Sequence, residues 1–348
     1  MKYLFLCVAF LSVFGKIIGT ERQVGSDSGF FLDGTFLYLQ AKEDGLEYGD
    51  KVDIFGVNGT PAFIAAKIHP KNPNFEWNPG FQVSLGYIFC KREAWDLALS
   101  WTHYISDSKR STSTSVDFPL ERILPGWDPF LTGAFASHAS AHWDLHYNIL
   151  DVCLEKYFSV GNWFAVKPTV GLRGAWIDQK YRTKYLATQD GLNFFNSNLK
   201  ARNDFSGLGV KAGTDLQWFL SKRWSILGNF ALSLIYGTFE LKQKVFGIIF
   251  PAPGVTIPEE FETKASEARI VPNLESKIGL QWQTFLSCHR YRISFGAFYN
   301  LFYWFHQNRL HNLSVFFNAL TFDTYINEIR NSGDLQIHGG SLEARFEF

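Results

Sequence analysis

The residues with the best metal-binding spacing in this chain are His142 and His146. On a helix, four-residue spacing would place both imidazoles on one face, as a zinc site requires. Their neighbours alternate instead, with apolar residues interleaved between polar ones: Trp143, Leu145, Tyr147 and Ile149 against His142, Asp144, His146 and Asn148. In a strand the two histidines would lie about 13 Å apart, at ~3.3 Å per residue. We therefore predict no metal site and no cofactor.

No other arrangement of residues predicts catalysis. The Gly207-Leu208-Gly209 segment is similar to a phosphate-binding loop, but no helix pattern follows it, and Lys211 and Asp215 continue the same alternation. The sequence has no nucleophile elbow, P-loop or CxxC pair, and no spacing of Ser, His and Asp singles out a triad. We predict that the protein is not an enzyme.

The N-terminus predicts export. Lys2 precedes an apolar run from Tyr3 to Phe14, and the small Gly15 and Gly19 follow. This pattern is typical of a signal peptide, here residues 1–19, which leaves residues 20–348 as a single domain. The exported chain keeps three cysteines, Cys90, Cys153 and Cys288. Because three is odd, at most one internal disulfide forms, and the leftover thiol either pairs between chains or is buried or lipid-facing.

Composition excludes several protein classes. The 348 residues carry 33 basic and 33 acidic side chains, and this balance argues against a nucleic-acid partner. An aromatic content of 17% argues against a disordered chain. Beyond the N-terminus, no apolar run reaches the ~18 residues that a membrane-spanning helix needs.

Alternation of period two dominates the remaining sequence. Phe81, Val83, Leu85, Tyr87 and Phe89 are apolar, whereas Gln82, Ser84 and Gly86 between them are polar or small. Such a pattern predicts a strand with one apolar face. It recurs in ten segments, near residues 30–40, 81–89, 95–102, 142–149, 164–176, 207–218, 224–241, 273–282, 291–300 and 342–348.

The connections between these segments alternate in length. Short connections are expected near 90–94, 158–162, 221–223 and 286–290, and long ones near 42–78, 106–138, 180–203, 243–268 and 306–334. Alternating lengths predict an all-β, transmembrane, antiparallel up-and-down β-barrel with short periplasmic turns and long extracellular loops. We expect about ten strands, or twelve if Leu313 to Tyr325 adds a hairpin. A soluble β-sandwich is the alternative.

Membrane barrels present apolar side chains to lipid and polar ones to the lumen. The expected lumen-lining residues are Asp96, Asp144, Lys167, Arg173, Lys211, Asp215, Glu275, Lys277 and Arg292. An aromatic girdle is expected beside the short turns, at Trp95, Trp163, Trp218, Trp224, Trp282 and Tyr291. Near the opposite boundary we expect Trp101, Trp176, Tyr236, Tyr303 and Trp304. The alternating C-terminal tail, with Phe346 and Phe348, is typical of the signal that barrel-assembly machinery reads.

Several stretches resemble the pore-forming major outer membrane protein family of Legionella and chlamydia-like bacteria. They include Trp77-Asn78-Pro79-Gly80-Phe81, the run from Pro168 to Asp178 and the run from Asn203 to Gly209. The resemblance implies a porin-like β-barrel that is abundant in the outer membrane.

Together, pattern and resemblance predict an integral protein of the bacterial cell outer membrane. We expect passive diffusion of small hydrophilic solutes, including ion transport, with lumen charges setting selectivity. Ten strands is near the narrow limit for an open bore, so a closed structural or adhesin-like surface-interaction barrel is the alternative. Expected partners are outer-membrane lipid, the barrel-assembly machinery and small solutes; a homo-oligomer is left open.

Overall fold

The computed structural model describes residues 29–57, 60–89, 95–114, 120–127, 135–189, 192–252, 255–286, 291–318, 323–330 and 332–348. In this part of the chain no helix is long and apolar enough to cross a membrane. The expected signal peptide, residues 1–19, lies outside the described residues.

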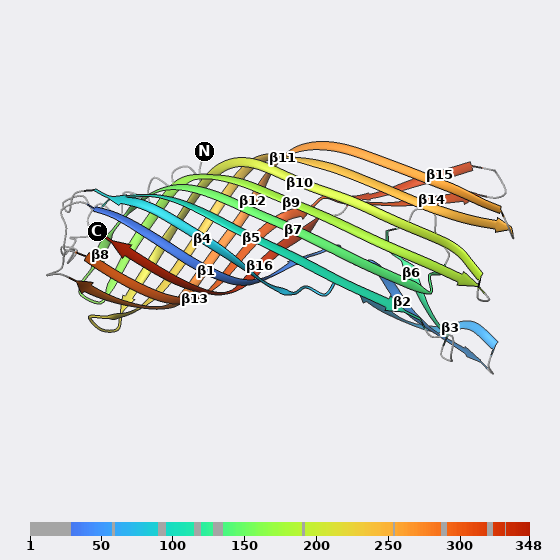
Figure 1. The fold of residues 1–348 in the computed structure, drawn as a ribbon, viewed down its shortest axis with the longest axis horizontal. Coiled ribbons are helices and arrows are strands. Elements are labelled where there is room, and N and C mark those ends of the chain that lie inside the picture. The colour runs from blue at the N-terminus through green and yellow to red at the C-terminus, as the bar shows by residue number, and fades with distance from the viewer. Residues whose placement is uncertain are drawn as a thin grey trace, which may run out of the picture.

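Ten antiparallel strands close a barrel, as the alternation predicts (Figure 1). They are β1 (Gly29–Glu43), β4 (Trp77–Ile88), β5 (Trp95–Ser113), β7 (His138–Lys156), β9 (Phe164–Gln189), β10 (Leu192–Phe219), β11 (Trp224–Ala252), β12 (Val255–Leu286), β13 (Tyr291–Asn308) and β16 (Gly333–Glu347). The first and last strands pair, with Phe31 opposite Glu347 and Glu43 opposite Leu335. Closure satisfies the backbone groups that an open edge would expose.

Six shorter strands lie outside the ten. β8 (Phe158–Val160) pairs with the start of β9, beside the turn at 161–163. β2 (Gly49–Val57), β3 (Thr60–Lys71) and β6 (Leu120–Pro125) form a separate sheet, and β14 (His311–Asn318) pairs with β15 (Asp323–Arg330). The last two lie at the end of the molecule away from the C-terminus (Figure 1). The hairpin expected near Leu313 to Tyr325 therefore exists, but it leaves the barrel at ten strands.

The expected long loops are mostly β-structure. β10, β11 and β12 contain 28, 29 and 32 residues, whereas a strand crosses a membrane with about 9–11. The segments 180–203 and 243–268, expected to be loops, are largely strand extensions. The period-two pattern continues through them, but the inward residues become apolar and the outward residues become charged.

This inversion of polarity is clear along β7. Val152 and Leu154 are exposed on the outer surface, while Asp151 and Cys153, which alternate with them, are buried. Farther from the short turns, Trp143 and Leu145 are buried inside and His142 and Asp144 face outward. Around the barrel, outward apolar side chains form a continuous apolar band. The edge of this band that lies farther from the short turns is marked by the exposed side chains of Tyr38, Trp101, Trp176, Leu208 and Tyr236.

Candidate functional site

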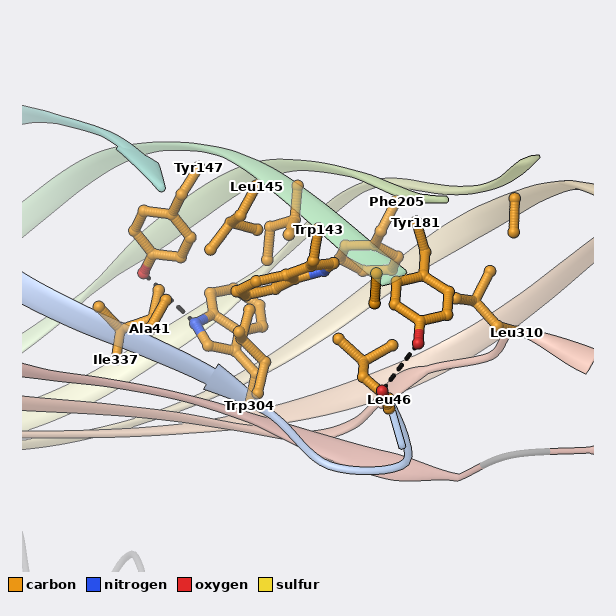
Figure 2. Close-up of a cluster of buried hydrophobic side chains, with 14 of the residues drawn as sticks. Ala41, Leu46, Trp143, Leu145, Tyr147, Tyr181, Phe205, Trp304, Leu310 and Ile337 are labelled. Carbon is orange, nitrogen blue, oxygen red and sulfur yellow. Dashed lines mark hydrogen bonds between the residues drawn. The ribbon is translucent and has the colours of Figure 1, made fainter. Parts of the chain in front are cut away.

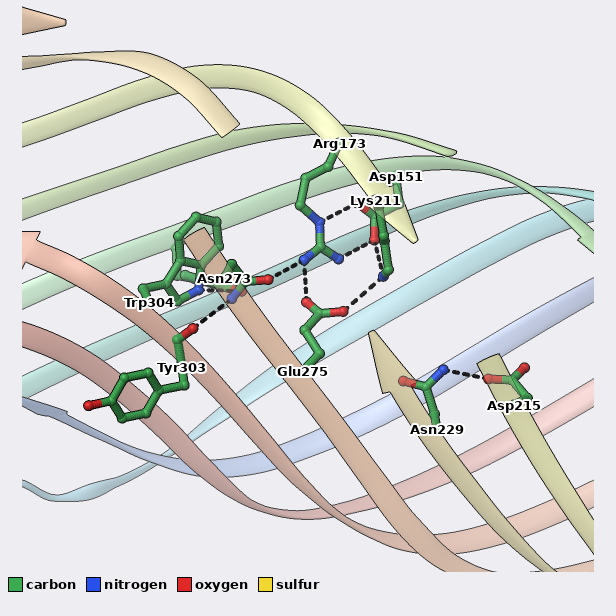
Figure 3. Close-up of polar contacts among 10 residues, drawn as sticks. Asp151, Arg173, Lys211, Asp215, Asn229, Asn273, Glu275, Tyr303 and Trp304 are labelled. Atoms are coloured by element: carbon green, nitrogen blue, oxygen red, sulfur yellow. Dashed lines mark hydrogen bonds and ion pairs between the residues drawn. The ribbon is translucent and has the colours of Figure 1, made fainter. Parts of the chain in front are cut away.

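Four charged side chains meet across the bore at the level of the apolar band (Figure 3). Arg173 donates from Nε to Asp151 Oδ1 at 2.7 Å and from Nη2 to Asp151 Oδ2 at 2.5 Å. Its Nη1 contacts Glu275 Oε1 at 2.5 Å. Lys211 Nζ completes the ring, at 2.8 Å from both Asp151 Oδ2 and Glu275 Oε2. We refer to Asp151, Arg173, Lys211 and Glu275 as the charged quartet.

Strand register explains how the charged quartet forms. Asp151 lies directly opposite Arg173 on neighbouring strands β7 and β9, so the two side chains leave the same face side by side. Lys211 follows on β10, and Glu275 reaches the group from β12. Asn273 Oδ1 accepts a further bond from Arg173 Nη1 at 2.6 Å. The charges are buried but balanced, with two of each sign, which limits the cost of removing them from water.

More ion pairs lie between the charged quartet and the short turns. Lys167 pairs with Glu155 and lies 3.4 Å from Asp96, whose side chain is almost fully buried. Lys277 pairs with Glu343, and Arg292 pairs with Glu347. Asp215 accepts a hydrogen bond from Asn229. Most of these groups line a polar cavity of about 270 Å³, which also touches Lys211 and Glu275.

On the side of the charged quartet away from the short turns, the bore is filled by an apolar core (Figure 2). Nine barrel strands contribute buried side chains to it. Among these side chains are Leu37, Tyr104, Trp143, Tyr147, Ile177, Phe205, Phe239, Val271, Trp304 and Ile337. Trp143 and Trp304 are both 0% exposed. Trp304 packs edge-on against Tyr147 and donates from Nε1 to its hydroxyl at 3.3 Å. We refer to this cluster as the apolar core.

The chain that follows β1 closes the far side of the apolar core. Tyr181 donates to the carbonyl of Leu46 at 2.8 Å, and Tyr185 donates to the carbonyl of Tyr48 at 2.5 Å. Trp127 donates to the carbonyl of Glu47 at 2.8 Å. Buried backbone carbonyls need such partners, so these three rings hold an irregular segment within the core.

One carboxyl group, Glu43, is buried among these side chains. Gln179 Nε2 donates to its Oε2 at 3.4 Å, and no partner for its Oε1 is found among the described residues. Glu43 lies beyond the apolar band, since the outward residue before it is Lys42. Burial raises the pKa of Glu43 well above its ordinary value, and the nearby charges of Asp44 and Asp334 raise it further.

We expect Glu43→Gln to stabilise the protein at neutral pH. The unfolded carboxyl ionises near its ordinary pKa, whereas the folded one stays protonated to higher pH. The wild type therefore loses stability as pH rises from the ordinary pKa toward the raised one. Melting temperatures in detergent at pH 4 and pH 8 check this. The gap between variant and wild type should be larger at pH 8, and Glu76→Gln, at an exposed glutamate, should not reproduce it.

Eight of the nine expected lumen residues face the interior: Asp96, Lys167, Arg173, Lys211, Asp215, Glu275, Lys277 and Arg292. Asp144 does not, and its expected position was wrong. It lies on the outer face, 2.5 Å from Arg182. The error has a physical cause, because the polarity inversion makes the apolar side of this part of β7 the inner one. Trp304 was expected on the outer surface near the membrane boundary, but it is buried in the bore for the same reason. Its neighbour Tyr303 does face outward.

The outer face carries a group that the sequence did not reveal. His142 Nε2 lies 2.6 Å from Asp107 Oδ2 and 3.0 Å from Asp144 Oδ1, and the three residues could offer converging metal ligands. However, Lys109 Nζ lies 3.0 Å from Asp107 and Arg182 contacts Asp144, so cationic side chains already neutralise both carboxylates. The cluster is better described as an ion-pair network. His146, four residues after His142, lies on the same outer face beyond Asp144.

The expected girdle residues lie at the rim with the short turns. Trp163, Trp218 and Trp224 are about half exposed, and Trp163 contacts Trp218 with ring centroids 5.6 Å apart. Trp95, Trp282 and Tyr291 are partly buried. Tyr291 stacks on Phe346, which in turn stacks on Phe348. Recognition of this tail by assembly machinery stays a prediction.

Of the three cysteines, Cys153 is a buried free thiol inside the barrel. Cys90 and Cys288 lie outside the described residues.

Residues 25–348 match the family model described as the Legionella pneumophila major outer membrane protein precursor. Similar solved structures include the outer membrane protease OmpT of Escherichia coli, at 7% identity and a TM-score of 0.38, covering 92% of this chain and 96% of that one. A Pseudomonas aeruginosa FadL homologue matches at 10% identity and a TM-score of 0.26, covering 92% and 90%. Ail of Yersinia pestis matches at 12% identity and 0.21, covering 63% and 97%.

Such low identities and TM-scores carry no argument about activity. No curated protein gives a significant match to the chain.

Proposed function

The chain belongs to the Legionella major outer membrane protein family and is an integral outer-membrane barrel, and from this premise we propose that it is closed to free diffusion. It would act as a membrane-anchored support for a rigid extracellular β-structure. The apolar band is then the membrane-spanning part, and the strand extensions with β2, β3, β6, β14 and β15 form the exposed surface. This corresponds to the structural or surface-interaction alternative from the sequence.

The packed bore is the observation that carries the proposal. A channel for hydrophilic solutes needs a continuous polar path, but the apolar core fills the extracellular half of the bore with side chains that exclude water. Beneath it the charged quartet spans the interior with short ion pairs. Small barrels are commonly filled by side chains, whereas open channels are typical of barrels with 16–18 strands.

A passive channel is the second candidate. The polar cavity of about 270 Å³ favours it, since both signs of charge line that cavity, as expected for a weakly selective path. Conduction would then require the apolar core to move aside.

Planar-bilayer recording distinguishes the two functions. Full-length mature protein is refolded in detergent, and its folded state is checked by heat-dependent migration on electrophoresis before insertion. We expect no current steps from inserted protein, in bilayers where an open porin gives steps. Reproducible steps from the wild type would eliminate the closed-barrel proposal and establish the channel.

We also propose that the protein performs no covalent chemistry. The described His142 group lies on the outer face and is occupied by ion pairs, and the contact between Ser113 Oγ and His138 Nδ1, at 2.9 Å, is exposed. The family description, a major outer membrane protein, is consistent with a non-enzymatic role.

A further inference from the structure

Cations lie directly opposite one another on the outer face of β9 and β10. Arg182 is opposite Lys200, and Lys180 is opposite Arg202. Lys184 continues the same outward face of β9. Like charges in directly opposite cross-strand positions destabilise a sheet. Two such pairs side by side make this part of the outer face strongly cationic. We refer to Lys180, Arg182, Lys184, Lys200 and Arg202 as the basic patch.

The chain itself neutralises only part of the basic patch. Arg182 contacts Asp144 at 2.5 Å, and Arg202 lies 3.6 Å from Asp204. Within the described ranges, Lys180, Lys184 and Lys200 have no ion-pair partner, and all three are exposed. Three exposed ammonium groups therefore remain to bind an external anion.

A hollow lies beside the basic patch, between β5, β7 and β9. Its volume is about 490 Å³, and its lining includes Lys109, Arg110, Ser111, Ser140, Arg182 and Lys184. Lysine and arginine give charge-assisted hydrogen bonds to phosphate oxygens, and serine hydroxyls add neutral donors. The lining thus has the chemistry of a phosphate-group site that opens outward.

The height of the basic patch identifies the source of the anion. The nearest outward apolar residues on the membrane side of the basic patch, Trp176 and Leu208, are 46% and 64% exposed. Lys180 follows Trp176 by four residues, which is a rise of roughly 10 Å for a tilted strand. That height corresponds to the headgroup layer just outside the hydrocarbon region.

Acidic residues lie in one row between the apolar band and the basic patch. Asp178 is opposite Asp204, and Asp204 is opposite Glu240. This row repels phosphate, so it favours placement of an anion above it, against the lysines. Height and charge together argue for a lipid headgroup rather than a solute captured from bulk water.

We propose that the basic patch and the adjoining hollow bind the phosphate groups of outer-leaflet glycolipid, and so fix the depth and orientation of the barrel in the membrane. The inference is independent of whether the bore conducts. It assigns a lipid contact to one side of the barrel, on β9 and β10, rather than to the whole circumference.

The test compares Lys180→Gln/Lys184→Gln/Lys200→Gln with a control that removes three lysines elsewhere, Lys42→Gln/Lys71→Gln/Lys222→Gln. Refolded full-length mature proteins in detergent are titrated with bisphosphorylated lipid A, and adducts are counted by native mass spectrometry. At roughly a factor of five per lysine, the triple variant should bind on the order of 100-fold more weakly. The control should bind like the wild type, and added salt should weaken wild-type binding.

Two further probes identify the source of the phosphate. Dephosphorylated lipid A should fail to bind, and inorganic phosphate at the same concentration should not compete with lipid A. Equal binding by the triple variant and the wild type would overturn the proposal. Full competition by inorganic phosphate would overturn the lipid assignment and indicate a site for a free anion. Both variants should show the wild-type heat-dependent migration, which checks that the barrel has folded.

Discussion

Replacing Arg173 with leucine is expected to lower the free energy of unfolding by about 3–5 kcal/mol, because the change leaves buried carboxylates without their main partner. Arg173 donates four hydrogen bonds, to Asp151, Glu275 and Asn273, and its side chain is 2% exposed. After the substitution, Lys211 alone would face both carboxylates. Urea unfolding in detergent, followed by circular dichroism, measures the loss.

Two controls separate this effect from a general loss of an arginine. Arg269→Leu removes an exposed ion pair with Glu267 and should change stability little, since solvent screens such pairs. The double variant Arg173→Leu/Glu275→Leu retains the Asp151–Lys211 pair and restores charge balance. It should be more stable than Arg173→Leu alone, because neighbouring sites in one network are not additive. A double variant less stable than the single one would contradict the account of the charged quartet.

Trp304→Ala is expected to cost about 3–5 kcal/mol, the range for emptying a large aromatic from a packed interior. Trp304 lies where the apolar core meets the charged quartet, since Asn273 is its cross-strand neighbour. Its removal would leave a void there and deprive the Tyr147 hydroxyl of a donor. The same unfolding measurement applies.

A tryptophan that faces lipid provides the matched comparison for Trp304. Trp176 is 46% exposed on the outer surface, so Trp176→Ala should cost clearly less than Trp304→Ala. If the two substitutions cost the same, the apolar core is not closely packed. In that case the bore would be looser, and the channel candidate would gain support.

Much of the fold follows from local pattern. Side chains alternate across any strand, so the run from Phe81 to Phe89 indicates a lipid-facing strand without knowledge of its neighbours. Alternating connection lengths then require an up-and-down barrel. Arg173 and Lys211 alternate with apolar residues along membrane-spanning strands. They were therefore expected on the face opposite to the lipid-facing one, inside the barrel.

The extracellular half could not be predicted in the same way. There β7 and β10 keep the period of two, but the medium outside changes from lipid to water. Trp143 therefore points inward and Asp144 outward, opposite to the expectation. Alternation reports that two faces differ; it does not report which face meets the solvent.

The sequence by itself determined the strands, their even number, the outer membrane and the charged interior of the membrane-spanning part, because each depends on residue spacing along one chain. Only the tertiary structure decided that Asp151, Arg173, Lys211 and Glu275 join in one network and that Trp304 helps to fill the bore. These contacts link residues up to 157 positions apart. They depend on strand register and barrel closure, which period alone leaves free.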